Sequence, residues 1–268
     1  MSKGKTISIL GCGWYGLALA RQLVKAGYSV KGSTTSTEKL KLLREQGIEP
    51  FLIDAGDEQN ALNPLFFESK ILVIAIPPRV RSGNGENYIP QIKNIIKAAK
   101  ASATVDHVIY ISSTGVYGDN NGVVTEMDPP KPSTESGRVL LVAEELLTNA
   151  SGFTTTIIRF GGLFGPSRDA GRFFAGKTNM PNGKAPINMI HLDDCLGITE
   201  AILTREGFGH IYNAASPEHP AKSSFYTHAA ERADLPRPKF IDELNEWKQV
   251  DSVNVPQLLN YNFKHSLI

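Results

Sequence analysis

The stretch Lys5-Thr-Ile-Ser-Ile-Leu-Gly-Cys-Gly-Trp-Tyr-Gly16 decides the fold. An apolar run leads into three glycines with the spacing G-x-G-x-x-G, and a helical pattern follows directly. The first glycine of such a loop permits a tight turn, the second lets a pyrophosphate approach the backbone, and the third lets helix and strand pack closely. Helix N–H groups then point at the phosphates. The pattern predicts a dinucleotide site, the alternative being a glycine turn without a ligand. The predicted contacts in this loop are Gly11, Gly13, Trp14, Tyr15 and Gly16.

Short apolar runs alternate with amphipathic stretches through the first part of the chain. The run Ile71-Leu-Val-Ile-Ala-Ile76 is continuous, which is typical of a strand buried on both faces. The alternation predicts an α/β fold with a doubly wound parallel sheet of the Rossmann type. The predicted strands are 5–10, 28–30, 49–53, 71–76, 107–111 and 154–160, and the predicted helices are 16–26, 37–46, 88–101 and 136–149.

The alternation weakens after Gly165-Pro166, where glycine, proline, asparagine and lysine become frequent. Strands at 187–190 and 209–213 and helices at 192–203 and 223–233 are still predicted there. We therefore expect a cofactor-binding domain over residues 1–165, with residues 166–268 forming a small C-terminal substrate-binding lobe fused to it.

Bulk composition points to a folded protein with a small-molecule partner. Hydrophobic residues make up 41% of the 268 residues and charged residues 21%, and the net charge is +1. So small a net charge gives no reason to expect nucleic acid or an anionic membrane. No apolar run approaches the roughly 20 residues that span a bilayer. The two cysteines, Cys12 and Cys195, form no disulfide pattern, and no apolar leader precedes the first strand, so a cytoplasmic protein is expected.

The end of the second predicted strand decides between the two nicotinamide cofactors. An NAD site normally places Asp or Glu about 20 residues past the glycine loop, where the carboxylate binds the ribose 2′-OH. Here the stretch 31–37 reads Lys-Gly-Ser-Thr-Thr-Ser-Thr, with no carboxylate before Glu38. Hydroxyl and N–H groups donate to a 2′-phosphate, so NADP is favoured while NAD stays open. The alternative is that these residues, Thr37 among them, cap the next helix. The predicted contacts are Ser33, Thr34, Thr35 and Ser36.

Three later motifs carry a resemblance that spans nearly the whole chain. They are Ile109-Tyr-Ile-Ser-Ser-Thr-Gly-Val-Tyr-Gly118, Arg159-Phe-Gly-Gly-Leu-Phe-Gly-Pro166 and Asn188-Met-Ile-His-Leu-Asp-Asp194. The chain resembles the extended short-chain dehydrogenase/reductase family, the nucleotide-sugar epimerase and dehydratase group, and its glycine loop is similar to the atypical branch. The resemblance implies that Ser113 orients the reacting oxygen of a substrate. It also implies cofactor contacts at Asp54 and Ala55 (adenine), Ala75, Ile76 and Pro77 (ribose), and Gly161 (nicotinamide).

The chain departs from that family at its catalytic pair, Tyr-x-x-x-Lys. Ser136 falls where the tyrosine belongs and Leu140 where the lysine belongs. A serine hydroxyl is a far weaker acid than a tyrosine, whose pKa is about 10. Tyr117 is the candidate replacement proton donor, the alternative being that it packs in its loop. We expect an NAD(P)-dependent oxidoreductase or epimerase acting on an alcohol or carbonyl, a nucleotide sugar being one candidate. The rival is an NADP-binding sensor without redox turnover.

Other polar groups suggest weaker hypotheses. His191 with Asp193 and Asp194 invites a metal-site interpretation, but no second histidine has ligand spacing, so no metal is expected and Asp194 is assigned to cap or brace the next helix. Two groups of cations favour an anionic substrate, although each also fits a solvated loop. They are Arg79 and Arg81, and Arg168, Arg172 and Lys177. By analogy with related folds, the helices at 88–101 and 136–149 predict a homodimer.

Overall fold

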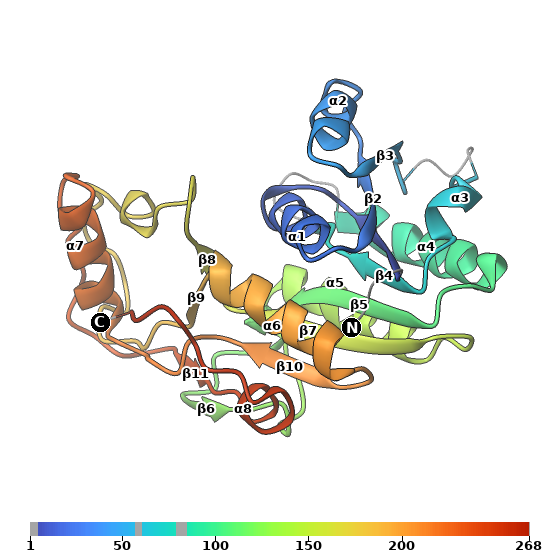
Figure 1. Ribbon diagram of the computed structural model, residues 1–268. Helices are drawn as coiled ribbons and strands as arrows, with labels where there is room; N and C mark the ends of the chain where they lie inside the picture. The colour runs from blue at the N-terminus through green and yellow to red at the C-terminus, as the bar shows by residue number, and fades with distance from the viewer. Residues whose placement is uncertain (1–4, 57–60, 79–84, 268) are drawn as a thin grey trace. The chain divides into compact units, whose positions relative to one another are not determined.

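The computed structural model describes residues 5–56, 61–78 and 85–267 (Figure 1). The chain forms two compact units that interleave along the sequence. The first unit comprises Met1–Ser112, Thr134–Ile158 and Ile202–Ile211, and the second comprises Ser113–Ser133, Arg159–Ala201 and Tyr212–Ile268. The boundary expected after residue 165 divides the chain in sequence order and stays a prediction.

A seven-stranded sheet forms the centre of the fold, in the order β10-β7-β5-β4-β1-β2-β3. The chain moves outward from β1 to β3 and then returns to the other side of β1, which is the doubly wound arrangement. The six strands expected in the first part of the chain are confirmed, and the strand expected at 209–213 is also confirmed as β10, the seventh strand of the same sheet. The strands are β1 (Thr6–Leu10), β2 (Ser29–Thr34), β3 (Glu49–Leu52), β4 (Ile71–Ile74), β5 (His107–Ser113), β7 (Thr154–Phe160) and β10 (Ile211–Ala214).

The middle of the sheet is buried on both faces, as the continuous apolar run predicted. All four residues of β4 are buried, and β4 pairs in parallel with β1 through Ile7↔Ile71 and Ile9↔Val73. Helices cover both sides of the sheet, so side chains that point to either face are buried away from water (Figure 1). β1 and β4 are neighbours in the sheet, and the connections that follow them run to opposite sides of it. The chain therefore leaves the carboxyl ends of these two strands in diverging directions. Such a divergence is where doubly wound folds bind ligands.

The helices of this part of the chain begin and end close to their predicted positions. The first begins at Trp14, two residues earlier than expected, and the αL conformation of Gly27 (φ +89°) follows its end. Thr134 caps α5 by accepting a hydrogen bond from the Gly137 N–H at 3.1 Å. The helices are α1 (Trp14–Lys25), α2 (Glu38–Glu45), α3 (Pro64–Phe67), α4 (Tyr88–Ser102), α5 (Glu135–Thr148) and α6 (Leu192–Arg205).

The second unit contains two small parallel sheets and an aromatic core. Phe225, Tyr226, Met189 and Leu267 are buried together, with Phe174 packed against them. The sequence predicted β9 and α7 but missed the other three-residue strands and α8, which are too short to show a period. The elements are β6 (Gly122–Val124) paired with β11 (Lys248–Val250), β8 (Gly162–Phe164) paired with β9 (Met189–His191), α7 (Lys222–Arg232), α8 (Asn254–Leu259) and the 3₁₀ turns η2 (Gly85–Asn87), η3 (Thr114–Val116) and η4 (Ala170–Arg172).

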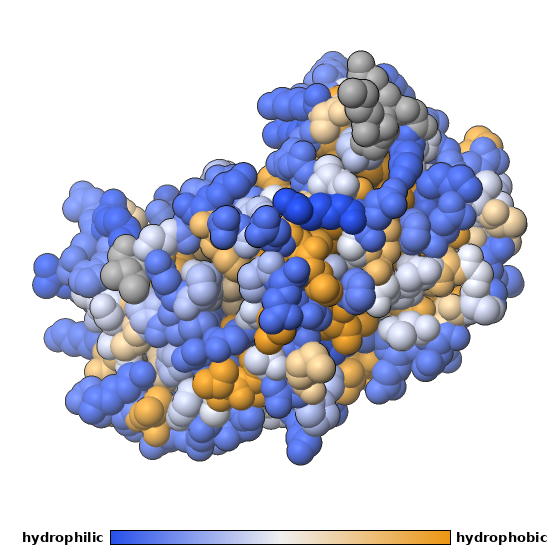
Figure 2. Space-filling view, turned by 60° about the horizontal axis from the view of Figure 1, so that its bottom comes forward, coloured by the Kyte–Doolittle hydropathy of each residue, from blue (hydrophilic) through white to orange (hydrophobic). Residues whose placement is uncertain are grey.

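The surface is mixed in character. Figure 2 shows hydrophilic side chains over most of the face in view, with hydrophobic side chains gathered in patches between them. Large hydrophobic residues exposed to water include Leu52, Leu65 and Met127. Within the ranges that the structure describes, none of the helices combines the length and the apolar character needed to cross a membrane.

Candidate functional site

A cavity of about 570 Å³ lies in the first unit, where the carboxyl ends of β1, β2, β3 and β4 meet. Residues that follow each of these strands line it, which is the position that the doubly wound topology gives to a ligand. The structure brings most of the predicted cofactor contacts together on this one wall. They are Gly11, Gly13, Ser33, Thr34, Thr35, Asp54, Ala55, Ala75, Ile76 and Pro77.

The glycine loop is shaped by close approach at one glycine and open space at another. Gly11 has φ +101°, and a Cβ there would stand 2.9 Å from Ile76 Cγ2 and 3.0 Å from the Ala75 carbonyl oxygen. Gly13 is exposed on the cavity, and a Cβ there would meet no described atom within 4 Å. The first turn of α1 carries no acidic residue. A concave backbone surface at a helix N-terminus fits a pyrophosphate.

Other predicted loop residues support the cavity without lining it. A Cβ on Gly16 would overlap the carbonyl oxygen of Gly11, so this glycine allows the helix and the loop to touch. Tyr15 is buried, and Trp14 is half-buried as the first residue of α1. Gly161 belongs to the second unit, where an added Cβ would lie 2.6 Å from the Asn188 carbonyl oxygen. Its contact with a nicotinamide stays a prediction.

The hydroxyl cluster after β2 organises the glycine loop as well as facing the cavity. The Gly11 N–H donates to Ser33 Oγ at 2.9 Å, and the Cys12 N–H donates to the Ser33 carbonyl at 2.8 Å. The Ser36 N–H donates to Thr34 Oγ1 at 3.1 Å, and Ser36 does not line the cavity. Thr37 precedes α2 but makes no side-chain capping bond, so the predicted cap is wrong there. Capping of α2 therefore does not explain the hydrogen bonds that Ser33 and Thr34 make.

Lys39 is the residue at this cavity that sequence reasoning missed. It lies in the first turn of α2, is exposed, and lines the cavity beside Thr34 and Thr35. The stretch 31–37, where a phosphate-binding arginine is expected, contains none, and Lys39 lies two residues past its end. Lys31, within that stretch, donates instead to the carbonyl oxygens of Leu65 and Glu68 and so anchors α3.

Cys12 also lines this cavity, although its side chain is buried. Burial raises the pKa of its thiol to about 12, and the hydrogen bond from Ser33 opposes this only in part. The thiol therefore stays protonated at neutral pH, where it cannot act as a nucleophile.

Ser113 ends β5 and starts the turn η3 in the second unit. Its Oγ accepts the Gly115 N–H at 3.1 Å, and its side chain is half-buried. The bond uses one lone pair and leaves the O–H able to donate to another oxygen. The neighbouring Ser112 differs, because its hydroxyl donates to the buried carboxylate of Glu144 at 2.6 Å. Of the two serines, Ser113 is the one whose hydroxyl suits a substrate contact.

Tyr117 lies in a filled hydrogen-bond network rather than at an open surface. Its side chain is 1% exposed, and its hydroxyl lies 2.9 Å from the Thr125 carbonyl and 3.1 Å from Asn213 Oδ1. Arg159 Nη1 donates to the same oxygen at 2.6 Å. Burial raises the pKa of Tyr117, and the positive charge of Arg159 opposes that rise. These contacts support the alternative that Tyr117 packs within its loop, and its role as a proton donor stays a prediction.

The two positions that replace the family's catalytic pair both lie on α5. Ser136 is half-buried in the first turn, and Leu140, one turn later, is 6% exposed. Neither supplies a phenol or an ammonium group. Arg138, between them, is exposed. The side chains on α5 therefore do not rebuild the missing pair.

The anion-binding role predicted for the five cations stays a prediction. Arg79 and Arg81 lie outside the described residues. Lys177 donates to the Phe173 carbonyl at 3.1 Å, and its ammonium lies 5.3 Å from the centre of the Phe174 ring. A second cavity of about 490 Å³, within the second unit, has Asp251 in its wall, and no lysine or arginine is among its described lining residues.

Comparison with known proteins agrees with this geometry. The family described as "NAD(P)H-binding" matches residues 11–190. Protein YeeZ of Escherichia coli strain K12 is 37% identical over 97% of this chain and 96% of its own length. Among solved structures, UDP-glucuronic acid 4-epimerase of Bacillus cereus in complex with NAD superposes with a TM-score of 0.80 at 21% identity, covering 98% of this chain and 94% of that one. UDP-glucose 4-epimerase of Thermotoga maritima gives 0.81 at 17% identity, with the same coverage. The structural likenesses show the fold alone.

Proposed function

Because this chain belongs to the NAD(P)H-binding family, we propose that it is an NADP-dependent oxidoreductase or epimerase acting on the alcohol or carbonyl group of a small molecule. The observation that carries the proposal is the open space at Gly13, at the N-terminus of α1 and on the wall of the cavity. A glycine with room for a side chain, in a loop where other glycines are crowded, is explained by a ligand that approaches the backbone. The matched fold of nucleotide-sugar epimerases makes nucleotide sugars the first substrate class to test, by analogy of fold.

Different residues around the cavity are assigned to different parts of the cofactor. Gly11, Gly13 and the first turn of α1 hold the pyrophosphate, while Asp54 and Ala55 border the adenine. Thr34, Thr35 and the Lys39 ammonium hold the 2′-phosphate that distinguishes NADP from NAD, because hydroxyl and ammonium donors suit a phosphate and the stretch 31–37 contains no carboxylate to repel it. When bound, the nicotinamide supplies a hydride donor or acceptor.

Ser113 is the side chain that we assign to the substrate. With one lone pair of its Oγ occupied by the Gly115 N–H, the hydroxyl hydrogen is able to rotate and donate to a carbonyl or alcohol oxygen. This hydrogen bond orients the oxygen and stabilises negative charge that develops on it. A serine does not release its proton readily at neutral pH, so the proton that completes a reduction comes from the substrate or from water.

Cofactor binding and turnover are tested separately. Calorimetric titration with NADPH and NADH is expected to give a Kd at least about tenfold lower for NADPH, since one charged contact is worth about 1.4 kcal/mol or more. Loss of nicotinamide absorbance on adding UDP-sugars or simple carbonyls then identifies a reductase and its substrate class. An epimerase returns the hydride to the substrate, so its activity is followed by chromatography of the product sugar. Ser113→Ala is expected to lower turnover without changing the Kd for NADPH. Equal affinity for NADH and NADPH would contradict the cofactor assignment, and unchanged turnover in Ser113→Ala would contradict the substrate assignment.

A second candidate function is an NADP sensor without redox turnover. Leu140 in place of the lysine, and the filled network around Tyr117, favour it specifically. Tight NADPH binding together with no hydride exchange across the same panel would select the sensor. Substrate-dependent oxidation of NADPH would exclude it.

A further inference from the structure

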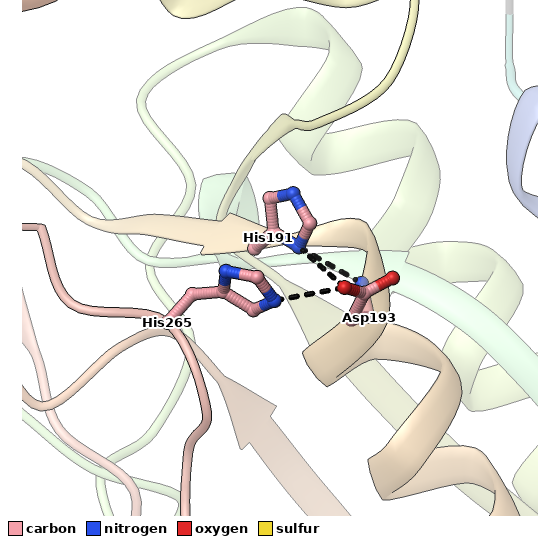
Figure 3. A group of neighbouring side chains, drawn as sticks. All are labelled: His191, Asp193 and His265. Atoms are coloured by element: carbon pink, nitrogen blue, oxygen red, sulfur yellow. Dashed lines mark hydrogen bonds and ion pairs between the residues drawn. The ribbon is translucent and has the colours of Figure 1, made fainter.

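Three side chains from two segments far apart in the sequence meet in the second unit (Figure 3). His191 ends β9, Asp193 lies in the first turn of α6, and His265 belongs to the C-terminal segment. Asp193 Oδ2 lies 3.5 Å from His191 Nδ1 and 2.8 Å from His265 Nε2. One ligand atom from each residue lies within 4.8 Å of the other two. The sequence argument against a metal rested on the lack of a second histidine at ligand spacing, and the fold brings one from 74 positions further along the chain.

We propose that His191, Asp193 and His265 form a binding site for a divalent transition-metal ion, with Zn²⁺ as the preferred ion. Two imidazole nitrogens and one carboxylate oxygen are a donor set that zinc takes when three ligands come from protein and one position stays open to water. Magnesium and calcium prefer sites made of oxygen ligands, so the two imidazoles select against them.

The spacing of the three groups fits such an ion. Zinc bonds to imidazole nitrogen and carboxylate oxygen are about 2.0–2.2 Å long, so two ligand atoms of a tetrahedral ion stand about 3.3 Å apart. The distances from Asp193 Oδ2, 2.8 and 3.5 Å, lie on either side of that value. The two imidazole nitrogens lie within 4.8 Å of each other, so the side chains turn toward the ion when it binds. Figure 3 shows both imidazole rings turned toward the same carboxylate oxygen.

The hydrogen bonds of the cluster show which ring nitrogens carry hydrogen. His191 Nδ1 accepts the Asp193 N–H at 3.2 Å, so this nitrogen carries none, and a bound ion would take its one lone pair from that long hydrogen bond. An ionised carboxylate only accepts hydrogen bonds, so His265 Nε2 carries the hydrogen that points at Asp193 Oδ2. When the ion binds, it takes the place of that hydrogen, and the proton moves to Nδ1 of His265. The ring stays neutral and no other group has to change its charge.

Asp194 fixes the position of His265. Its carboxylate is 1% exposed and accepts the Tyr261 hydroxyl at 2.8 Å, the Lys264 N–H at 2.7 Å and the His265 N–H at 3.2 Å. The sequence analysis assigned this residue to its own helix, whereas the structure shows that it binds the C-terminal segment. Groups that hold a ligand in place behind the metal are part of a metal site.

The chain is also held on the other side of His265. The Glu218 carboxylate accepts the Ser266 hydroxyl at 2.9 Å and the Leu267 N–H, and Leu267 is buried in the aromatic core. The imidazole of His265 is therefore carried by a segment that is fixed at both neighbours. A site whose ligands are positioned in advance loses less entropy on binding the ion.

The site is partly open, with side-chain exposures of 13% for His191, 52% for Asp193 and 37% for His265. Water completes the coordination of the ion from the exposed side. Because the ion joins the C-terminal segment to the start of α6, binding is expected to stabilise the folded protein by an amount that rises with the logarithm of the metal concentration above the Kd.

The test is a titration of tag-free full-length protein, stripped with EDTA and dialysed, with ZnCl₂ in a calorimeter and with CoCl₂ in a spectrophotometer. We expect one Zn²⁺ per chain, a rise in Tm with Zn²⁺ and a visible Co²⁺ absorption band of tetrahedral intensity. His265→Gln and Asp193→Asn are each expected to weaken Zn²⁺ binding by about 100-fold or more, exceeding the loss that an outer-shell partner causes. His228→Gln, at an exposed histidine on α7, is the matched control and leaves binding unchanged.

Two results would overturn the proposal. One is Zn²⁺ affinity in His265→Gln and Asp193→Asn equal to that of the unsubstituted protein. The other is a loss in His228→Gln as large as theirs. Far-UV circular dichroism and urea unfolding without metal check that each variant is folded, and Asp193→Asn, an isosteric change at an exposed position, keeps the test decisive if His265→Gln loosens the C-terminal segment.

Discussion

The glycine loop at residues 11–16 and the network around Tyr117 show opposite ways of using polar groups after a sheet strand. The loop follows β1 and leaves open space at Gly13, on a cavity wall. The network lies beyond the end of β5 and closes on itself, because the Tyr117 hydroxyl, Asn213 and Arg159 satisfy one another away from water. Open space beside a helix N-terminus implies a ligand, whereas a closed network implies stability. The structure thus supports cofactor binding more strongly than any particular proton donor.

Filling the space at Gly13 gives the largest expected effect. Gly13→Val places a side chain where no described atom stands within 4 Å, so the free energy of unfolding is expected to change by less than about 1 kcal/mol. The Kd for NADPH is expected to rise by about 100-fold or more, because the pyrophosphate can no longer approach the backbone. Calorimetric titration measures the Kd for NADPH, and urea unfolding measures the free energy of unfolding.

Gly122→Ala is the matched control for that change. It also adds a side chain to a glycine, but in β6 of the second unit, with the nearest atom 3.7 Å from the new Cβ. It is expected to leave NADPH binding unchanged. If Gly13→Val bound NADPH as tightly as the control, the open loop would not be the phosphate site. The open space at Gly13 would then indicate no ligand.

The glycine loop could be predicted because the interactions that shape it join residues close together in the sequence. A strand, three glycines and a helix lie within about twenty residues, and each glycine has a steric reason that the spacing alone reveals. The continuous run of β4 was predictable for the same reason, since burial on both faces requires an apolar residue at every position. Thr34 and Thr35 were found on the wall because they end a strand, and Lys39 was missed because one helical turn separates it from them.

The contacts of the second unit depend on long-range packing that no local pattern encodes. Tyr117 meets Asn213 across 96 positions, and Asp193 meets His265 across 72. Single histidines and aspartates are common on surfaces, so their spacing along the chain carried no signal for a cluster. Asp194 was assigned to its own helix because an aspartate in the first turn normally interacts with that helix. Only the path of the C-terminal segment shows that it binds elsewhere.

Removing the hydroxyl of Tyr117 tests whether the closed network around it stabilises the fold instead of taking part in catalysis. Tyr117→Phe removes the buried hydrogen bonds that the phenol makes with Arg159 Nη1 and Asn213 Oδ1, which is expected to cost about 1–3 kcal/mol in the free energy of unfolding. With Tyr117 in a structural role, turnover at saturating substrate changes less than about threefold, because the phenol never reaches the substrate. Tyr28→Phe, at a buried tyrosine in the first unit, is the control for stability. A loss of turnover above about 100-fold, with stability unchanged, would instead identify Tyr117 as the proton donor.

Lys39 gives the smallest expected effect and the most selective one. Lys39→Ala is expected to raise the Kd for NADPH by about tenfold, below the value of a buried charged hydrogen bond because this lysine is exposed to water. The Kd for NADH is expected to stay unchanged, since NADH has no 2′-phosphate. Lys41→Ala is the matched control, because Lys41 lies on the same helix, pairs with Glu45 and does not line the cavity. Added salt is expected to reduce the difference between NADPH and NADH in the unsubstituted protein and to have less effect on it in Lys39→Ala. If both lysine variants lost the same affinity for both cofactors, the effect would come from net charge alone, and the cofactor preference would have to be sought in the hydroxyls of Ser33, Thr34 and Thr35.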